Sequence, residues 1–182
     1  MNAEERSRTL PTLTAGRDGE SPWTALEEGG ARLAFDDFLT TMMSHATNAL
    51  RRALTAPYAE QAGVTVSEWR MLVVLAEARQ LPFMELVARS GADKAQVSRT
   101  LRLLERRGLL SLQAEQQGSR KWQTCHISPH GEELYERVIP LARRRQVAVL
   151  RQLDEDDRAV LYRALKALRR IGDAAVASAA TR

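Results

Sequence analysis

Apolar residues recur every three or four positions along several stretches of the chain, which is the spacing of one buried face of an α-helix. These stretches cover 33–55, 65–78, 83–89, 93–107, 129–150 and a last segment that follows the acidic residues 154–157. Pro57 is expected to end the first stretch, because proline lacks the backbone N–H that a helix interior needs. The pattern therefore predicts a mainly helical protein.

The period of the apolar residues falls to two after residue 108, which is typical of β-strands. Leu110, Leu112 and Ala114 alternate with polar residues, and a second short strand is expected from Trp122 to Ile127. The polar segment between them, 115–120, supplies the turn. A small two-stranded β-hairpin is therefore predicted directly after the fourth helical stretch.

Capping signals mark where the helices around this hairpin begin. Thr65 is followed three residues later by Glu68, which is the pattern of a capping box. Asp93 and Gln96 repeat that spacing, and the segment 90–92, with a glycine at its centre, separates this helix from the short one before it. Two short helices joined by a three-residue turn and followed by a hairpin have the order of a winged helix-turn-helix.

Composition limits the class of protein. The chain has 182 residues, of which 44% are hydrophobic and 27% are charged, as in ordinary globular domains. Its longest purely apolar run, 71–76, is too short to cross a bilayer, so no membrane partner is expected. A single cysteine, Cys125, excludes an internal disulfide and fits a reducing cytoplasm. Residues 1–28 carry scattered prolines and glycines without an apolar period, which predicts a flexible N-terminal arm.

Positive charge is concentrated in the predicted second helix of the helix-turn-helix. Between Arg89 and Arg107, six basic residues face two acidic ones, an excess of four that equals the excess of the whole chain. A charged helix face is most often only a solvated surface, but the turn, cap and hairpin around it favour DNA binding. The candidate DNA contacts are Lys94, Ala95, Gln96, Ser98, Arg99 and Arg102 on the helix, with Arg120 and Lys121 at the hairpin tip.

Base reading is expected from two of these residues. Arginine can pair with guanine and glutamine with adenine in the major groove, so Gln96 and Arg99 are the predicted base-reading side chains. Lys94 and Ser98 suit phosphate oxygens. Arg120 and Lys121 form a basic pair suited to the minor groove or its phosphates, although a solubilising turn is the plainer interpretation.

The segment from Thr65 to Gly131 resembles the winged-helix core of the MarR family of bacterial transcriptional regulators, and weaker resemblance extends over about 33–171. The motifs that carry it are Ser67-Glu68-Trp69-Arg70, Asp93-Lys94, Val97-Ser98-Arg99, Leu104-Glu105-Arg106-Arg107-Gly108-Leu109, Arg120-Lys121, Ile127-Ser128 and Gly131. This sequence departs from the family at Ser119, where the wing usually carries an acidic residue that orients its arginine.

The resemblance implies a homodimer that binds a pseudo-palindromic operator, most simply as a repressor that associates with the nucleoid when bound to DNA. Its organisation would be a winged helix-turn-helix at 62–128 and a helical dimerisation lobe at 33–58 and 129–175. A small anionic ligand, an aromatic acid or its coenzyme A thioester, would bind between the two lobes and release the DNA.

Candidate ligand contacts lie on the first two long helical stretches. They are Met42, His45, Arg52, Trp69 and Arg70. Three of them have a plainer interpretation: Trp69 as ordinary core, Arg70 as a surface ion pair and His45 as a hydrogen-bonded interface residue. Cys125, in a predicted wing strand, is expected to be a small structural residue rather than a thiol sensor.

Other functional classes find less support in the sequence. No phosphate-binding glycine loop, nucleophile elbow or paired catalytic carboxylates occur, so an enzyme and a cofactor are not expected. His126 and His130 beside Cys125 offer metal-binding side chains without a recognised zinc spacing. Two alternatives stay open: a DNA-binding regulator without a ligand, and a helical adaptor that uses its winged helix to bind a protein.

Overall fold

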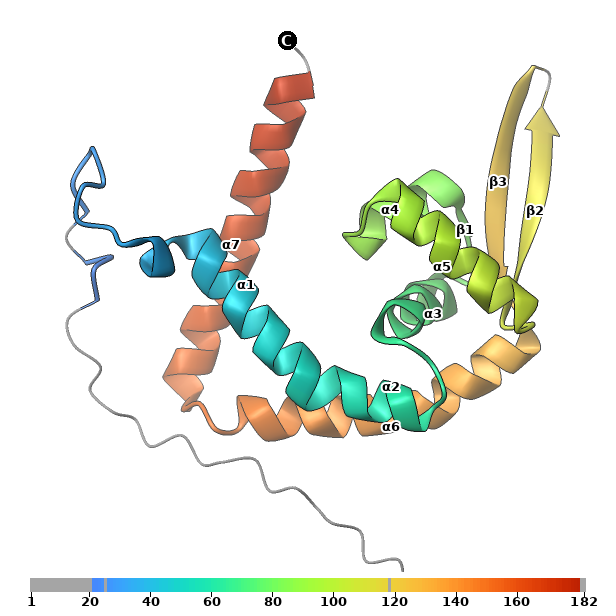
Figure 1. Ribbon diagram of the computed structural model, residues 1–182, viewed down its shortest axis with the longest axis horizontal. Helices are drawn as coiled ribbons and strands as arrows, with labels where there is room; N and C mark the ends of the chain where they lie inside the picture. Colours follow the sequence, from blue (N-terminus) through green and yellow to red (C-terminus); the bar gives the residue numbers. More distant parts are fainter. Residues whose placement is uncertain (1–20, 25, 118, 181–182) are drawn as a thin grey trace, which may run out of the picture. The chain divides into compact units, whose positions relative to one another are not determined.

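The structure is a computed structural model that describes residues 21–180 except Ala25 and Gly118. The chain divides into one compact unit over Glu20–Arg144 and a second whose described part begins at Arg145. The elements in chain order (Figure 1) are η1 (Phe35–Asp37), α1 (Leu39–Leu50), η2 (Arg51–Thr55), α2 (Ala56–Gln61), α3 (Val66–Ala78), β1 (Gln80–Pro82), α4 (Phe83–Ser90), α5 (Lys94–Arg106), β2 (Leu110–Gln117), β3 (Arg120–Ile127), α6 (Pro129–Leu150) and α7 (Glu155–Ala180). The predicted mainly helical fold with a small β-hairpin wing is confirmed.

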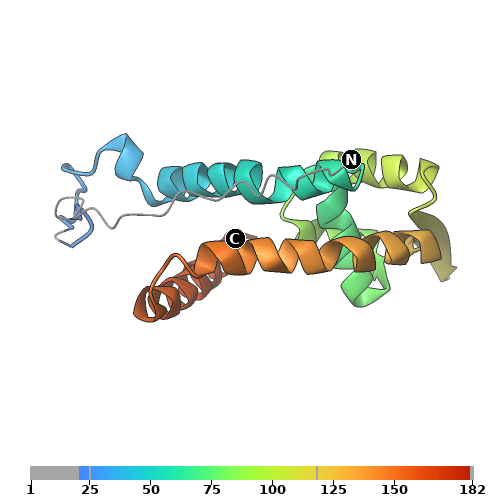
Figure 2. The same ribbon diagram turned by 90° about the horizontal axis from the view of Figure 1, so that it is seen from below.

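The first helical stretch is longer than its sequence predicts. Figure 2 shows an unbroken helical path from α1 through η2 to α2, which ends at Gln61 rather than before Pro57. The segment η2 is a π-helical turn, which is wider than an α-helical turn. Pro57 is the second residue of α2, so the wider turn comes immediately before the turn that contains the proline. The prediction that Pro57 ends the helix was therefore wrong.

The predicted two-stranded hairpin is part of a three-stranded antiparallel sheet. Its strand order is β1-β3-β2, so β3 lies at the centre and both of its neighbours are edge strands. In the register, Cys125 of β3 stands between Leu81 of β1 and Leu112 of β2. Pro82 is the last residue of β1 and the N-cap residue of α4. Three residues with one buried leucine are too short a pattern to reveal a strand.

The core of the Glu20–Arg144 unit lies among α3, α5, the base of the sheet and α6. Its fully enclosed side chains include Leu72 and Leu75 of α3, Leu101 and Leu104 of α5, and Cys125 of β3. Because these helices pack on one shared core, the orientation of α5 depends on α3 and on the hairpin.

The second unit contains the end of α6 and the whole of α7. Asp154 caps α7, since its Oδ1 accepts a hydrogen bond from the backbone N–H of Asp157 at 2.8 Å. Several large apolar side chains of α7 are exposed in the single chain: Val160, Leu161, Tyr162, Leu165, Ile171 and Val176. None of the described helices combines the length and the apolar character that a membrane crossing requires.

Candidate nucleic-acid interface

Helix α5 presents one buried face and one basic exposed face. Its N-terminus is capped by Asp93, whose Oδ1 accepts from the backbone N–H of Gln96 at 2.8 Å. Val97, Leu101 and Leu104 point into the core. The opposite face is exposed at Lys94, Ala95, Arg99, Arg102 and Arg106. The structure therefore places the predicted basic stripe on the solvent side of a well-anchored helix.

Two of the six basic residues counted in this region are bound to acids. Arg107 pairs with Glu68 at 3.3 Å and also donates to the carbonyl of Gly63 at 2.8 Å. Arg89 pairs with Glu85 one turn earlier on α4. Both acids lie outside the counted segment, so the charge excess in the sequence overstates the free positive charge.

The remaining four cations are Lys94, Arg99, Arg102 and Arg106. Within the part of the chain that the structure describes, none of them has an ion pair with an acidic side chain. Glu105 is near them along the helix, but its Oε1 accepts from the backbone N–H of Leu112 at 3.1 Å. Four exposed cations without acidic partners make this face attractive to a polyanion.

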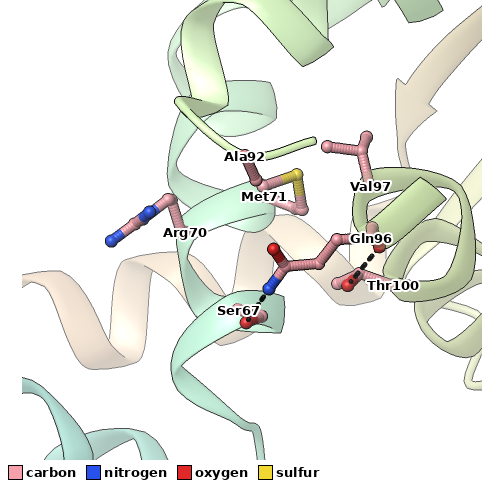
Figure 3. A pocket seen from close by; sticks show the side chains of 7 residues that line it. All are labelled: Ser67, Arg70, Met71, Ala92, Gln96, Val97 and Thr100. Carbon is pink, nitrogen blue, oxygen red and sulfur yellow. Dashed lines mark hydrogen bonds between the residues drawn. The ribbon is translucent and has the colours of Figure 1, made fainter. Parts of the chain in front are cut away.

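Gln96 is less available than the sequence suggests. Figure 3 shows its side chain turned toward α3, where its Nε2 donates to the hydroxyl of Ser67 at 3.4 Å. It also lines a cavity of about 20 Å³, which has room for about one water molecule. The side chain therefore does not close the expected capping box, and it would have to leave Ser67 to read a base.

The hairpin β2–β3 forms the wing. Its last pair in the register is Gln117 with Arg120, and Lys121 pairs with Gln116 one step closer to the base. Both predicted wing cations therefore belong to β3 at the far end of the hairpin. Ser119 is exposed at the turn itself.

Of the five candidate ligand residues, only Arg70 lines the small cavity beside Gln96. Trp69 is 4% exposed and packs between the rings of Tyr58 and Tyr135, with centroid separations of 5.8 and 6.1 Å. Its interpretation as a core residue is thus the one that the structure favours. Arg70 is exposed, donates weakly to the carbonyl of Ser90 at 3.4 Å and lines the small cavity beside Gln96.

The other three candidates lie on the first helical path. Met42 and His45 of α1 and Arg52 of η2 are all exposed. None of the three lines the cavity that contains Arg70. A binding site that joins these residues would need a conformational change or a second chain.

Cys125 is an inert interior thiol. It is fully buried in the central strand, and desolvation raises its pKa to about 11, with a smaller contribution from the negative charge of Glu105. A thiol with a raised pKa has little of the reactive thiolate at neutral pH. Among the described residues, no group of three or more histidine, cysteine or acidic side chains is placed to hold a metal ion.

Sequence reasoning missed the structural roles of Glu105 and Arg107. Each was counted only as a charge, yet Glu105 contacts the wing and Arg107 contacts α3 and the turn before it. The sequence does contain one signal for these contacts. Both residues lie at the end of a predicted helix, and Gly108 and a predicted strand follow directly. Side chains at such a junction lie near both elements.

A capped basic helix behind a helix-turn and in front of a two-stranded wing defines a winged helix-turn-helix protein. Comparison of sequences agrees, since residues 62–121 match the sequence profile of the MarR family. This segment is therefore a MarR-family segment, of the kind found in transcriptional regulators, and the resemblance noted in the sequence is confirmed. No functionally curated protein matches the sequence.

Several solved structures are similar to the chain. A MarR/EmrR family transcriptional regulator from Acinetobacter sp. ADP1 is 27% identical, with a TM-score of 0.68 over 77% of this chain and 98% of that one. NadR in complex with 4-hydroxyphenylacetate is 25% identical, with a TM-score of 0.58 over 69% and 88%. BpsR of Bordetella bronchiseptica, whose DNA binding is regulated by 6-hydroxynicotinic acid, shares the fold at 18% identity and a TM-score of 0.59 over 70% and 98%.

Proposed function

We propose that this chain is a sequence-specific DNA-binding regulator that acts as a repressor in the cytoplasm. The observation that carries the proposal is the exposed face of α5, where four cations without acidic partners among the described residues stand on a capped helix directly before the wing. A helix with such a face fits the major groove, and a basic wing fits the adjacent phosphates or minor groove.

The candidate DNA contacts divide by the chemistry that they offer. Arg99 and Arg102 have guanidinium groups that can pair with guanine edges in the groove. Lys94, Ala95 and Ser98, in the first turns of α5, are suited to the DNA backbone, together with the wing residues Arg120 and Lys121. Gln96 can contact adenine only after it leaves Ser67, so we assign the main base reading to Arg99.

Replacing Arg99 by alanine is expected to weaken binding to a selected duplex and to relax its preference at one base position. The loss should be about 1 to 3 kcal/mol per half-site, because a bidentate contact to guanine is removed. Lys94→Ala is the matched variant, since it also removes one exposed positive charge from α5. It should weaken all sequences alike.

The measurement is fluorescence anisotropy with a duplex that the wild-type chain selects from a random pool, compared with duplexes substituted at each position. An unchanged base preference in Arg99→Ala would exclude the groove assignment. A helical adaptor that binds a protein instead would show no salt-dependent duplex binding at all.

We also propose that the chain acts as a homodimer. The proposal is supported by the exposed apolar side chains of α7 and by Val147 and Leu150 at the end of α6, since exposed apolar surface often marks a protein interface. A two-fold dimer would require a pseudo-palindromic operator with half-site centres about 10 base pairs apart, or a multiple of one turn.

Sedimentation should accordingly give a mass near twice 20.4 kDa, even at sub-micromolar concentration. Deletion of residues 154–182 should produce monomer or aggregate, because it removes the whole of α7. A well-folded monomer of the full chain would contradict the dimer.

We further propose that a small anionic ligand, aromatic in part, releases the DNA. NadR, the similar structure that contains 4-hydroxyphenylacetate, supports this class of ligand. In this chain Arg70 is an exposed cation that lines the small cavity beside α5, which makes it the proposed partner of the carboxylate. Met42, His45 and Arg52 are further candidate contacts. Trp69 would take part only if it left its aromatic neighbours.

In a thermal unfolding screen of hydroxylated aromatic carboxylates, beginning with 4-hydroxyphenylacetate, at least one compound is expected to raise the unfolding temperature of the chain. At 100 times its dissociation constant a ligand that binds only the native state adds about 2.7 kcal/mol of stability. Arg70→Ala should lose this effect while duplex binding persists, and Arg163→Ala on α7 should keep both. Equal affinity of wild type and Arg70→Ala for an identified ligand would remove Arg70 from the site.

A further inference from the structure

The wing and α5, the proposed recognition helix, are joined by a side-chain hydrogen bond in addition to the backbone turn between them. Glu105 lies in the last turn of α5, and its Oε1 accepts from the backbone N–H of Leu112, the third residue of β2, at 3.1 Å. Strand β2 is an edge strand, so the outward N–H groups along it have no neighbouring strand to bond with. Glu105 supplies an acceptor for one of them.

This contact lies at the point about which the wing would pivot. The backbone turn is fixed by the bond from the N–H of Gly108 to the carbonyl of Glu105 at 2.8 Å, and the hairpin then extends away from α5 (Figure 1). Five residues separate Leu112 from Gln117, which corresponds to about 17 Å of strand. A rotation of about 10° at Leu112 would displace the tip by about 3 Å over such a length. A displacement of that size separates a side chain from a phosphate to which it is hydrogen-bonded.

The hydrogen bond between Glu105 and Leu112 also affects the positive charge of the basic face of α5. Arg102 is one turn earlier on the same helix, at a spacing where an acid and a base can pair. Instead, Glu105 accepts a hydrogen bond from the backbone of the wing, and it forms no ion pair with Arg102. The negative charge is thus held at the hairpin, where it also contributes to the raised pKa of Cys125.

We propose that Glu105 is a positioning residue that fixes the angle of the wing relative to the recognition helix, so that the end of the hairpin, which carries Arg120 and Lys121, lies against DNA while α5 occupies the groove. The inference rests on the proposed DNA-binding function and adds to it a residue that does not itself touch DNA. It is specific to the side-chain oxygen of Glu105 rather than to its charge, because the bond to Leu112 needs only an acceptor at that distance.

Three substitutions at one position separate the acceptor from the charge. Glu105→Gln removes the charge and keeps an oxygen at the same reach. Glu105→Asp keeps the charge and shortens the side chain by one methylene, and Glu105→Ala removes both. All four proteins are titrated by fluorescence anisotropy against the duplex that wild type selects from a random pool, after thermal unfolding has verified that each variant is folded.

Glu105→Gln should bind at least as tightly as wild type, since it gains a net positive charge and keeps the bond. Glu105→Ala has the same net charge as Glu105→Gln and should bind about fivefold more weakly than it, which is the size expected for one lost hydrogen bond. Glu105→Asp should bind more weakly than wild type by a similar factor. Equal affinities of the glutamine and alanine variants would overturn the proposal.

The salt dependence of binding distinguishes a displaced wing from a general loss of stability. Each phosphate contact that is lost reduces the slope of log affinity against log salt by about one. Glu105→Ala should show this reduction relative to Glu105→Gln, and combining it with Arg120→Ala should produce little further change. Full additivity of the two would overturn the proposal, whereas absence of duplex binding by wild type would instead contradict the proposed function.

Discussion

Gly131→Ala is expected to lower the free energy of unfolding of the chain by about 3 kcal/mol or more. A Cβ at this position would lie 2.1 Å from the carbonyl oxygen of Leu109 and 3.0 Å from Cγ1 of Ile127. The first of these neighbours is backbone, which cannot rotate away as a flexible side chain can. The first turn of α6 would therefore have to separate from the turn that joins α5 to β2.

Ser128 shows why this separation would be costly. Its hydroxyl donates to the carbonyl of Gly108 at 2.6 Å and accepts from the N–H of Gly131 at 3.0 Å. The close approach of Gly131 and Leu109 is thus part of a hydrogen-bonded junction between α6 and the wing. Overpacking of a tightly packed site usually costs about 1 to 3 kcal/mol, and a backbone clash should reach or exceed the upper value.

Urea unfolding followed by circular dichroism measures this loss. Gly29→Ala is the control, because a methyl group at Gly29 would meet nothing within 4 Å and its backbone does not have a positive φ. It should unfold at the same urea concentration as wild type. Equal stability of Gly131→Ala and wild type would show that α6 does not pack on the wing junction as the structure has it.

Glu68→Ala should lower the free energy of unfolding by about 3 kcal/mol, since it removes a helix cap of about 1 kcal/mol and a charge-assisted hydrogen bond of about 2. Glu68 is buried, with its Oε2 accepting from the N–H of Thr65 at 2.7 Å and its Oε1 from Arg107. The capping box predicted at Thr65 is confirmed, and the carboxylate that closes it also reaches across to the recognition helix.

Chemical denaturation of a double-mutant cycle tests this second role. Arg107→Ala leaves the Glu68 carboxylate without its cation, so it should be destabilising in its own right. If the pair acts as a unit, the double variant should cost less than the sum of the two single ones. Strict additivity would mean that Glu68 acts only as a cap. Glu68→Gln provides the conservative comparison, because it keeps an acceptor for Thr65 and loses the charge.

Local signals in the sequence predicted the elements whose ends are set by nearby residues. Thr65 with Glu68 marks the start of α3, Asp93 marks the start of α5, and Gly108, with a φ of 68°, ends the turn after it. Each of these signals depends on contacts between residues no more than four positions apart, so it can be recognised from the sequence alone. The winged helix and its basic face followed from these signals.

Features that depend on distant contacts were not visible in the same way. Strand β1 exists because Leu81 pairs with Cys125, more than forty residues later. Arg107 counts as free charge until Glu68 is found beside it, and Gln96 counts as a base reader until Ser67 is found within reach. Trp69 likewise belongs to the core because Tyr58 and Tyr135 enclose it. Side-chain partners across the fold, rather than residue types, decide these cases.

The buried state of Cys125 makes this chain convenient for single-site labelling. It is the only cysteine in the sequence, and its thiol, enclosed in the central strand with a pKa of about 11, is about one part in ten thousand thiolate at pH 7. A cysteine introduced by Ser119→Cys, at an exposed position of the wing turn, would then be the one thiol that reacts in the native protein. A fluorophore or spin label attached there would report the position of the wing, free and on DNA, without removal of the native cysteine.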